Sequence, residues 1–215
     1  GAIMKDHIHY FSKSDHIKKA EIIEKIGLRG KQANEFSMLD LPILPGFIID
    51  SDVACYLEDY SIPDYLKNYF KKLAKETNKD FGNPENPMLV KLVISPNLVI
   101  ANFPTLHNFG LTDDTISGFT NFVGENFAYH EVQFLIKGML EVEHRIAEFE
   151  NRAKDAEAIN KQLESVNEQI DKEVSVEDRK KAIEAFKKYL PDNFFSDAYT
   201  QMDISLKRIS KLLLL

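Results

Sequence analysis

The stretch GLRGKQANEF, residues 27–36, carries residue types that could bind an anion. Arg29 and Lys31 flank Gly30, and a helix-forming run follows. Backbone N–H groups of a glycine turn at a helix start, with a lysine ammonium beside them, suit phosphate oxygens. The same residues are also compatible with an ordinary loop into a helix. The stretch therefore predicts either an anion-binding turn or a simple helix start.

Histidines close to the N-terminus form a second group of candidate ligands. His7, His9 and His16 are near one another in the sequence. Their spacing matches no standard zinc site, and no cysteine or carboxylate pattern completes one. We therefore expect no metal at these histidines, and we expect no catalytic residue in the chain. His107 is expected to be a partly buried histidine with its hydrogen bonds satisfied.

Short elements that would position these residues fill the first part of the chain. Apolar runs bounded by Gly, Pro or Asn are typical of strands, and apolar steps of three and four are typical of helices. Lys91 falls in the first arm of a predicted hairpin, and Ser51 or Asp52 is expected to cap a helix. The predicted strands are 7–11, 46–50, 88–94 and 98–101, and the predicted helices include 30–39 and 64–78.

The second part of the chain predicts helix almost throughout. Apolar residues recur at steps of three and four along 142–170, with polar residues between them. This pattern predicts one amphipathic helix over 127–172, roughly 65–70 Å long at about 1.5 Å per residue. Two shorter helices are expected to fold back against it. Their predicted N-caps are Ser175, in a capping-box-like sequence, and Ser196 or Asp197.

Composition limits the class of protein. The chain has 215 residues, 44% of them hydrophobic and 28% charged, as in ordinary globular domains. A net charge of -7 disfavours nucleic acid and anionic membranes as partners, and no apolar run approaches the ~20 residues that span a bilayer. The single cysteine excludes an internal disulfide, and without a visible signal peptide we expect a cytoplasmic protein. We expect an α+β protein, with an α+β domain over 4–125 and a helical hairpin or bundle over 126–215.

Five stretches of the chain resemble one enzyme family. They read GKQANE (30–35), LPILPGFIIDSDVACYLED (41–59), KDFGNPENPMLVKLVIS (79–95), TLHNFGL (105–111) and ENFAYHEVQFLI (125–136). In this order and spacing they resemble the N-terminal nucleotide-binding domain of the pyruvate phosphate dikinase and phosphoenolpyruvate synthase family. The most specific match is FGNPENP. The resemblance implies an ATP-grasp fold with a small mixed sheet and helices. It also implies an enzyme that uses ATP and Mg²⁺ to phosphorylate a histidine in a separate domain.

The resemblance also implies a role for the stretch at 27–36. It places Lys31 at the phosphate-binding lysine of the family, with Gly30 in the turn and Arg29 as an extra cation nearby. Gln32 replaces a family glycine and is expected to crowd the approach of phosphate. The carboxylates for Mg²⁺ are expected from a second ATP-grasp subdomain, beyond Leu215. The nucleotide is thus the expected partner of this chain.

Other family positions depart from the pattern. The phosphate-binding arginine of the family falls on Val93, and a later arginine pair falls on Gln133 and Phe134. Lys91 remains as a weak second cation, since an ammonium cannot replace the bidentate fork of an arginine. Two hypotheses follow: a nucleotide-binding part of a phosphotransferase, or a non-catalytic interaction module that binds a partner through 126–215. The chain by itself is not expected to be catalytic.

Overall fold

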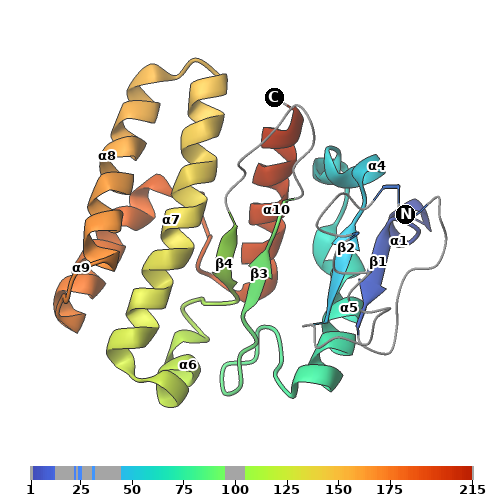
Figure 1. Ribbon diagram of the computed structural model, residues 1–215, viewed down its shortest axis with the longest axis horizontal. Coiled ribbons are helices and arrows are strands. Elements are labelled where there is room, and N and C mark those ends of the chain that lie inside the picture. The colour runs from blue at the N-terminus through green and yellow to red at the C-terminus, as the bar shows by residue number, and fades with distance from the viewer. Residues whose placement is uncertain are drawn as a thin grey trace. The chain divides into compact units, whose positions relative to one another are not determined.

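The chain folds into two compact units. The computed structural model describes residues 2–12, 22, 24–25, 31, 45–94 and 105–214. The first unit comprises Gly1–Lys79 and Val93–Pro104, and the second comprises Asp80–Leu92 and Thr105–Leu215 (Figure 1). Helices and antiparallel strands occur together, so the α+β class predicted from the sequence is confirmed. The proposed domain limits, 4–125 and 126–215, stay a prediction.

The first unit is built on a pair of antiparallel strands. Strand β1 (Ile8–Phe11) pairs with β2 (Gly46–Ile49), with Ile8 opposite Ile49. Both strands agree with the predicted 7–11 and 46–50, as expected for apolar and aromatic residues on a pleated surface. The described helical elements of this unit are α1 (Ala2–Lys5), α4 (Ser51–Ala54), the 3₁₀ turn η1 (Leu57–Asp59) and α5 (Ile62–Thr77).

Helix α5 supplies the core of the first unit. Its bounds agree with the helix predicted over 64–78, and its buried residues recur at steps of three and four: Ile62, Leu66, Phe70 and Leu73. The ring of Phe47 in β2 lies 5.4 Å from the rings of both Tyr69 and Phe70, centroid to centroid. These aromatic contacts join the sheet to the helix by burying apolar area.

The second unit is mostly helical. Strand β3 (Val90–Leu92) pairs antiparallel with β4 (Leu106–Phe109) across a register shift. The predicted second hairpin arm, 98–101, lies outside the described residues. The helical elements are α6 (Ile116–Val123), α7 (Glu125–Phe149), α8 (Ala153–Ile170), α9 (Val176–Phe186), the 3₁₀ turn η2 (Lys187–Tyr189) and α10 (Ala198–Leu214).

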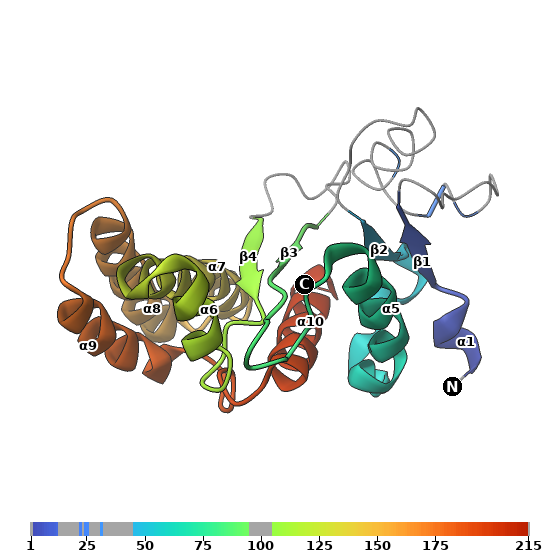
Figure 2. The ribbon, with the colours of Figure 1, turned by 90° about the horizontal axis from the view of Figure 1, so that it is seen from below.

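Helix α7 is the centre of the second unit. It packs against α6, α8, α9, α10 and β4, and Figure 2 shows α6 to α9 grouped together with β4 beside α7. Many of its apolar side chains are fully buried, and each contributes about 1.5–3 kcal/mol by leaving water. At Gly138 a Cβ atom would approach Leu106 Cδ2 to 2.7 Å, so β4 lies close to the α7 backbone.

The prediction of one helix over 127–172 is wrong. The chain instead makes two helices, α7 and α8, which pack against each other. Asn151 adopts a left-handed backbone with φ of 58°. Its N–H donates to Glu148 O (3.1 Å), and the N–H of Arg152 donates to Ala147 O (2.9 Å). These two bonds form a Schellman motif, which ends α7 although the apolar spacing continues into α8.

Helix caps agree with the sequence in two of three places. The Ser175 hydroxyl accepts the N–H of Asp178 at the start of α9, as predicted. Asp197 likewise accepts the N–H of Thr200 at the start of α10. Helix α4 differs, because its N-cap is Asp50 rather than Ser51 or Asp52.

Within the described ranges, no helix has the length and hydropathy needed to cross a bilayer.

Candidate functional site

The predicted phosphate-binding turn is described only at Lys31. This lysine is helical and half-buried, and it belongs to the first unit. Arg29 and Gly30 lie outside the described residues. A helical Lys31 agrees with the predicted helix over 30–39 at this one position. Its role in phosphate binding stays a prediction.

Lys91, the second predicted cation, lies at the middle of β3. Its side chain is exposed, whereas its neighbours Val90 and Leu92 are half-buried. Lys91 belongs to the second unit and Lys31 to the first. Both ammonium groups are the kind of donor that binds phosphate oxygens of ATP. Neither supplies the oxygen ligands that Mg²⁺ prefers, so we assign no Mg²⁺ site to them.

The positions where the resemblance implied lost arginines are occupied by packed side chains. Gln133 is fully buried in α7, where its amide donates to Gln169 and accepts from Arg179. The half-buried ring of Phe134 contacts the ring of His130, with centroids 5.2 Å apart. His107 also contacts Phe134, but it is exposed rather than partly buried as predicted.

A cluster of histidines and aspartates lies at the end of the β1–β2 pair. His7 precedes β1 and His9 lies within it, so their side chains share one face of the sheet. Asp50 follows β2, and its N–H donates to His7 O (3.0 Å), which extends the ladder by one pair. The Asp50 carboxylate is thereby opposite His7 and diagonal to His9, within reach of both rings.

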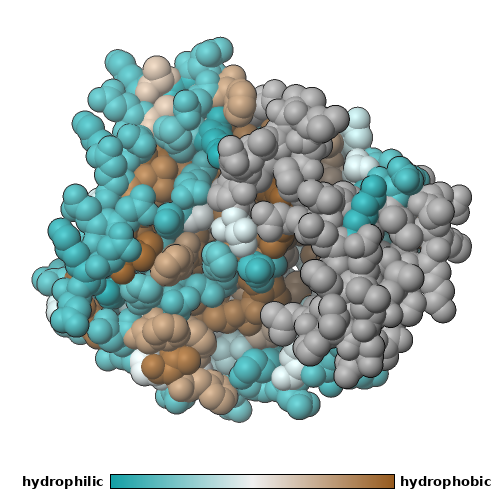
Figure 3. All heavy atoms as spheres, viewed as in Figure 1, coloured by the Kyte–Doolittle hydropathy of each residue, from teal (hydrophilic) through white to brown (hydrophobic). Residues whose placement is uncertain are grey.

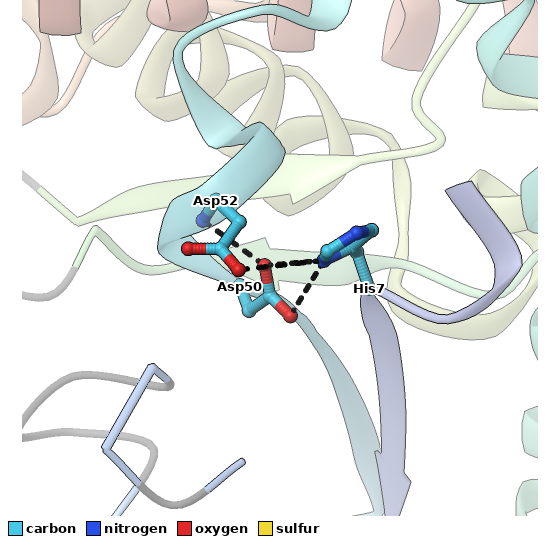
Figure 4. A group of neighbouring side chains, drawn as sticks. All are labelled: His7, Asp50 and Asp52. Atoms are coloured by element: carbon cyan, nitrogen blue, oxygen red, sulfur yellow. Dashed lines mark hydrogen bonds and ion pairs between the residues drawn. The ribbon is translucent and has the colours of Figure 1, made fainter. Parts of the chain in front are cut away.

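The carboxylate of Asp50 is almost completely enclosed by donors. His7 Nδ1 lies 3.0 and 3.1 Å from its two oxygens (Figure 4). His9 Nε2 lies 2.9 Å from Oδ2. The N–H of Asp52 donates to Oδ1 at 3.0 Å, which caps α4. Only 2% of the Asp50 side chain is exposed. A buried carboxylate is stable only when its oxygens accept hydrogen bonds, and here three groups donate them.

Asp52 and Lys25 complete this cluster at its exposed side. Lys25 Nζ lies 2.7 Å from Asp52 Oδ2, and this hydrogen bond lowers the pKa of Asp52. His7, Asp50 and Asp52 each offer one ligand atom, and these atoms lie within 4.8 Å of one another. The expectation of no metal at His7, His9 and His16 stays a prediction, and His16 lies outside the described residues.

The sequence does not signal this cluster clearly. His7 and His9 alternate within the predicted strand 7–11, but Asp50 lies far along the chain, at the end of the predicted strand 46–50. Only the strand pairing brings them together. The arrangement joins β1, β2 and α4 by hydrogen bonds, so its evident effect is to hold these elements together.

Comparisons with known proteins address the chain as a whole. No protein-family profile matches it. Pyruvate, phosphate dikinase of Treponema pallidum is 40% identical over 206 residues, which cover 96% of this chain and 23% of that protein. Pyruvate, phosphate dikinase of Rickettsia bellii is 30% identical over 122 residues, 52% of this chain and 13% of that protein. The protein of the same name from Rickettsia felis is 27% identical over 129 residues, 57% of this chain and 15% of its own length.

The chain belongs to the pyruvate, phosphate dikinase family. The identity to the Treponema protein extends over nearly all of this chain, including both compact units. The chain spans about a quarter or less of the length of its pyruvate, phosphate dikinase relatives. The relationship therefore indicates that the chain corresponds to a segment of a protein of this family.

Proposed function

We propose that this chain is part of the nucleotide-binding region of a cytoplasmic, pyruvate, phosphate dikinase-like phosphotransferase, with an ATP-grasp fold. The observation that carries the proposal is the 40% identity to the Treponema protein over 96% of this chain. The region would act with other parts of such an enzyme, such as a second ATP-grasp subdomain. ATP would supply the phosphoryl group, and Mg²⁺ would require oxygen ligands from outside Lys31 and Lys91.

In this proposal Lys31 holds a phosphate group of the nucleotide. Phosphoryl transfer depends mainly on positioning and on neutralising negative charge. The half-buried side chain of Lys31 carries an ammonium group that can do both when it contacts a phosphate oxygen. Arg29 and Gly30 would contribute a second charge and a backbone N–H. Lys91 would be a weaker contributor, because its exposed charge is screened by solvent.

A titration of the purified chain with Mg-ATP tests this function. Lys31→Ala is expected to weaken binding about tenfold, because it removes one charge-assisted hydrogen bond to phosphate. The matched control is Lys154→Ala, an exposed lysine of α8 whose loss is expected to leave the affinity unchanged. Absence of binding at millimolar Mg-ATP would contradict nucleotide binding by this chain. Equal affinities of wild type and Lys31→Ala would contradict the role of Lys31.

An interaction module is the second candidate function. Phe122, Val123 and Phe127 are exposed by 61%, 37% and 52% at the junction of α6 and α7. Figure 3 shows apolar residues gathered over this junction. Contiguous exposed apolar residues are typical of interaction surfaces. A chain that stays monomeric at all concentrations in sedimentation and captures no partner would count against this function. A captured partner that Phe127→Ser binds equally well would also count against it.

A further inference from the structure

An open cleft of about 350 Å³ lies in the second unit, outside the residues of the proposed nucleotide site. Its polar lining comes from Glu143 of α7, Arg152 and Asp155 at the start of α8, Lys188 of η2 and Arg208 of α10. We call it the Arg208 cleft. Its volume falls within the range of about 300–1,000 Å³ that is usual for small-molecule sites.

The charges of the Arg208 cleft favour an anion. Both carboxylates are already neutralised: Arg208 Nε and Nη2 lie 2.7 and 2.6 Å from the oxygens of Glu143, and Arg152 Nη1 lies 2.7 Å from Asp155. Lys188 makes no ion pair with any residue that the structure describes. Arg152 also binds Glu150, which does not line the cleft, through Nε and Nη2. The positive charge open to an anion therefore comes from Lys188, beside the paired guanidinium of Arg208.

Donors remain available for a ligand in this cleft. Arg208 uses Nε and Nη2 on Glu143, and Nη1 has no acceptor among the described residues. The exposed ammonium of Lys188 offers three more N–H donors. Because Glu143 fixes the Arg208 fork in place, the remaining donor is held in one orientation before a ligand arrives.

The rest of the lining is apolar. Ile159 and Leu190 have only 8% of their surface exposed, and Pro191 and the half-exposed ring of Tyr189 lie beside them. A flat hydrocarbon body placed against these side chains would bury apolar surface, which favours binding, while its charged end reaches the cations. Inorganic anions lack such a body, so the lining favours an organic one.

From these features we propose that the Arg208 cleft binds a small organic anion, with its acidic group on Lys188 and Arg208 and its apolar body on Ile159, Leu190 and Tyr189. The shared chemistry is an aryl or short-chain group that carries a phosphate, sulfonate or carboxylate. The inference goes beyond the proposed function and does not depend on Lys31.

Phenyl phosphate, benzoate and the neutral benzyl alcohol test the proposal by amide chemical shifts of the ¹⁵N-labelled chain. Phenyl phosphate is expected to shift the amides of residues 152–155 and 188–190 at concentrations up to about 10 mM. Benzoate is expected to shift the same amides, because its carboxylate is also an anion. Benzyl alcohol is expected to shift them less than either anion does. No shift at these amides with either anion, or an equal shift with benzyl alcohol, would overturn the proposal.

Variants at Lys188 separate a charge-selective site from a solvent-filled surface hollow. Lys188 is exposed, so Lys188→Gln should keep the fold and weaken phenyl phosphate binding about fivefold, while Lys188→Arg retains it. Lys161→Gln is the matched control, since Lys161 is a highly exposed lysine of α8 that does not line the cleft. Equal binding by wild type and Lys188→Gln would overturn the proposal. Mg-ATP affinity is expected to be the same in Lys188→Gln, so the result is independent of the nucleotide titration.

Discussion

Arg179 of α9 donates from Nη1 to Oε1 of Gln133 in α7 over 2.5 Å, with both side chains buried. The same guanidinium donates to Asn126 Oδ1 and to the backbone oxygens of Gln169 and Lys172. No carboxylate is among its hydrogen-bond partners in the described residues, and burial lowers the pKa of Arg179. Its charge is instead balanced by the carbonyl oxygens at the C-terminal end of α8, where the helix dipole is negative.

Replacement of Arg179 tests this buried link. Arg179→Met keeps the length of the side chain but leaves its four acceptors without a donor, so the free energy of unfolding is expected to fall by about 2–4 kcal/mol. Chemical denaturation measures the change. Lys181→Met is the control, because Lys181 is exposed on the same helix. A loss below about 1 kcal/mol would show that water replaces the guanidinium.

Asp50 is expected to stabilise the first unit in two separable ways. Asp50→Asn keeps an oxygen to cap α4 but removes the charge that His7 and His9 face, and we expect a loss of about 1–2 kcal/mol. Asp50→Ala removes the cap as well and should lose about 1 kcal/mol more. Equilibrium unfolding of both variants gives the comparison. Equal losses would mean that the α4 cap contributes nothing.

Asn151 is expected to define the boundary between α7 and α8. Its positive φ disfavours a β-branched residue, so Asn151→Val should lower the free energy of unfolding by about 1–2 kcal/mol. Asn151→Gly should stay within about 0.5 kcal/mol of wild type, since glycine adopts this conformation freely. Thermal and urea unfolding distinguish the two variants. If both behave alike, the left-handed backbone is not what limits this position.

Gly118 of α6 allows the turn at 81–87 to pack closely. A Cβ atom there would lie 1.8 Å from Pro84 O and 2.9 Å from Pro84 C, both backbone atoms. Gly118→Ala is therefore expected to lower the free energy of unfolding by more than about 2 kcal/mol, because the turn must move. The control is Ser117→Ala, at an exposed position of the same helix. A Gly118→Ala variant as stable as Ser117→Ala would contradict this close packing.

Glu141 is expected to make stability depend on pH. Burial raises the pKa of its carboxyl, while Lys137 and Arg145 act against this rise. The folded chain therefore holds this proton more tightly than the unfolded chain, so stability declines as pH rises from the unfolded to the folded pKa. Glu141→Gln should remove this decline and give a small gain near neutral pH but none in acid. Unfolding measured from acid to neutral pH, with the exposed Glu157→Gln as control, checks the sign.

Local features of this fold could be predicted from the sequence. The apolar pattern predicted α5 and the strands β1 and β2 because side-chain periodicity records which face is buried. Ser175 and Asp197 predicted helix starts because a cap is a local hydrogen bond. The break at Asn151 was not predicted, because periodicity alone cannot show where the backbone changes direction. Among the candidate phosphate-binding residues, Arg29 and Gly30 lie outside the described residues, and the phosphate role of Lys31 and Lys91 stays a prediction.

The sequence by itself determined the α+β class and the family of this chain, since both depend on local patterns and on residues compared one by one. Only the tertiary structure decided which distant residues meet. His7 and Asp50 face each other because β1 and β2 pair. Arg179 reaches Gln133 because α9 packs on α7. Such contacts join residues far apart in the chain, and their partners are selected by the packing of whole elements, which no local spacing records.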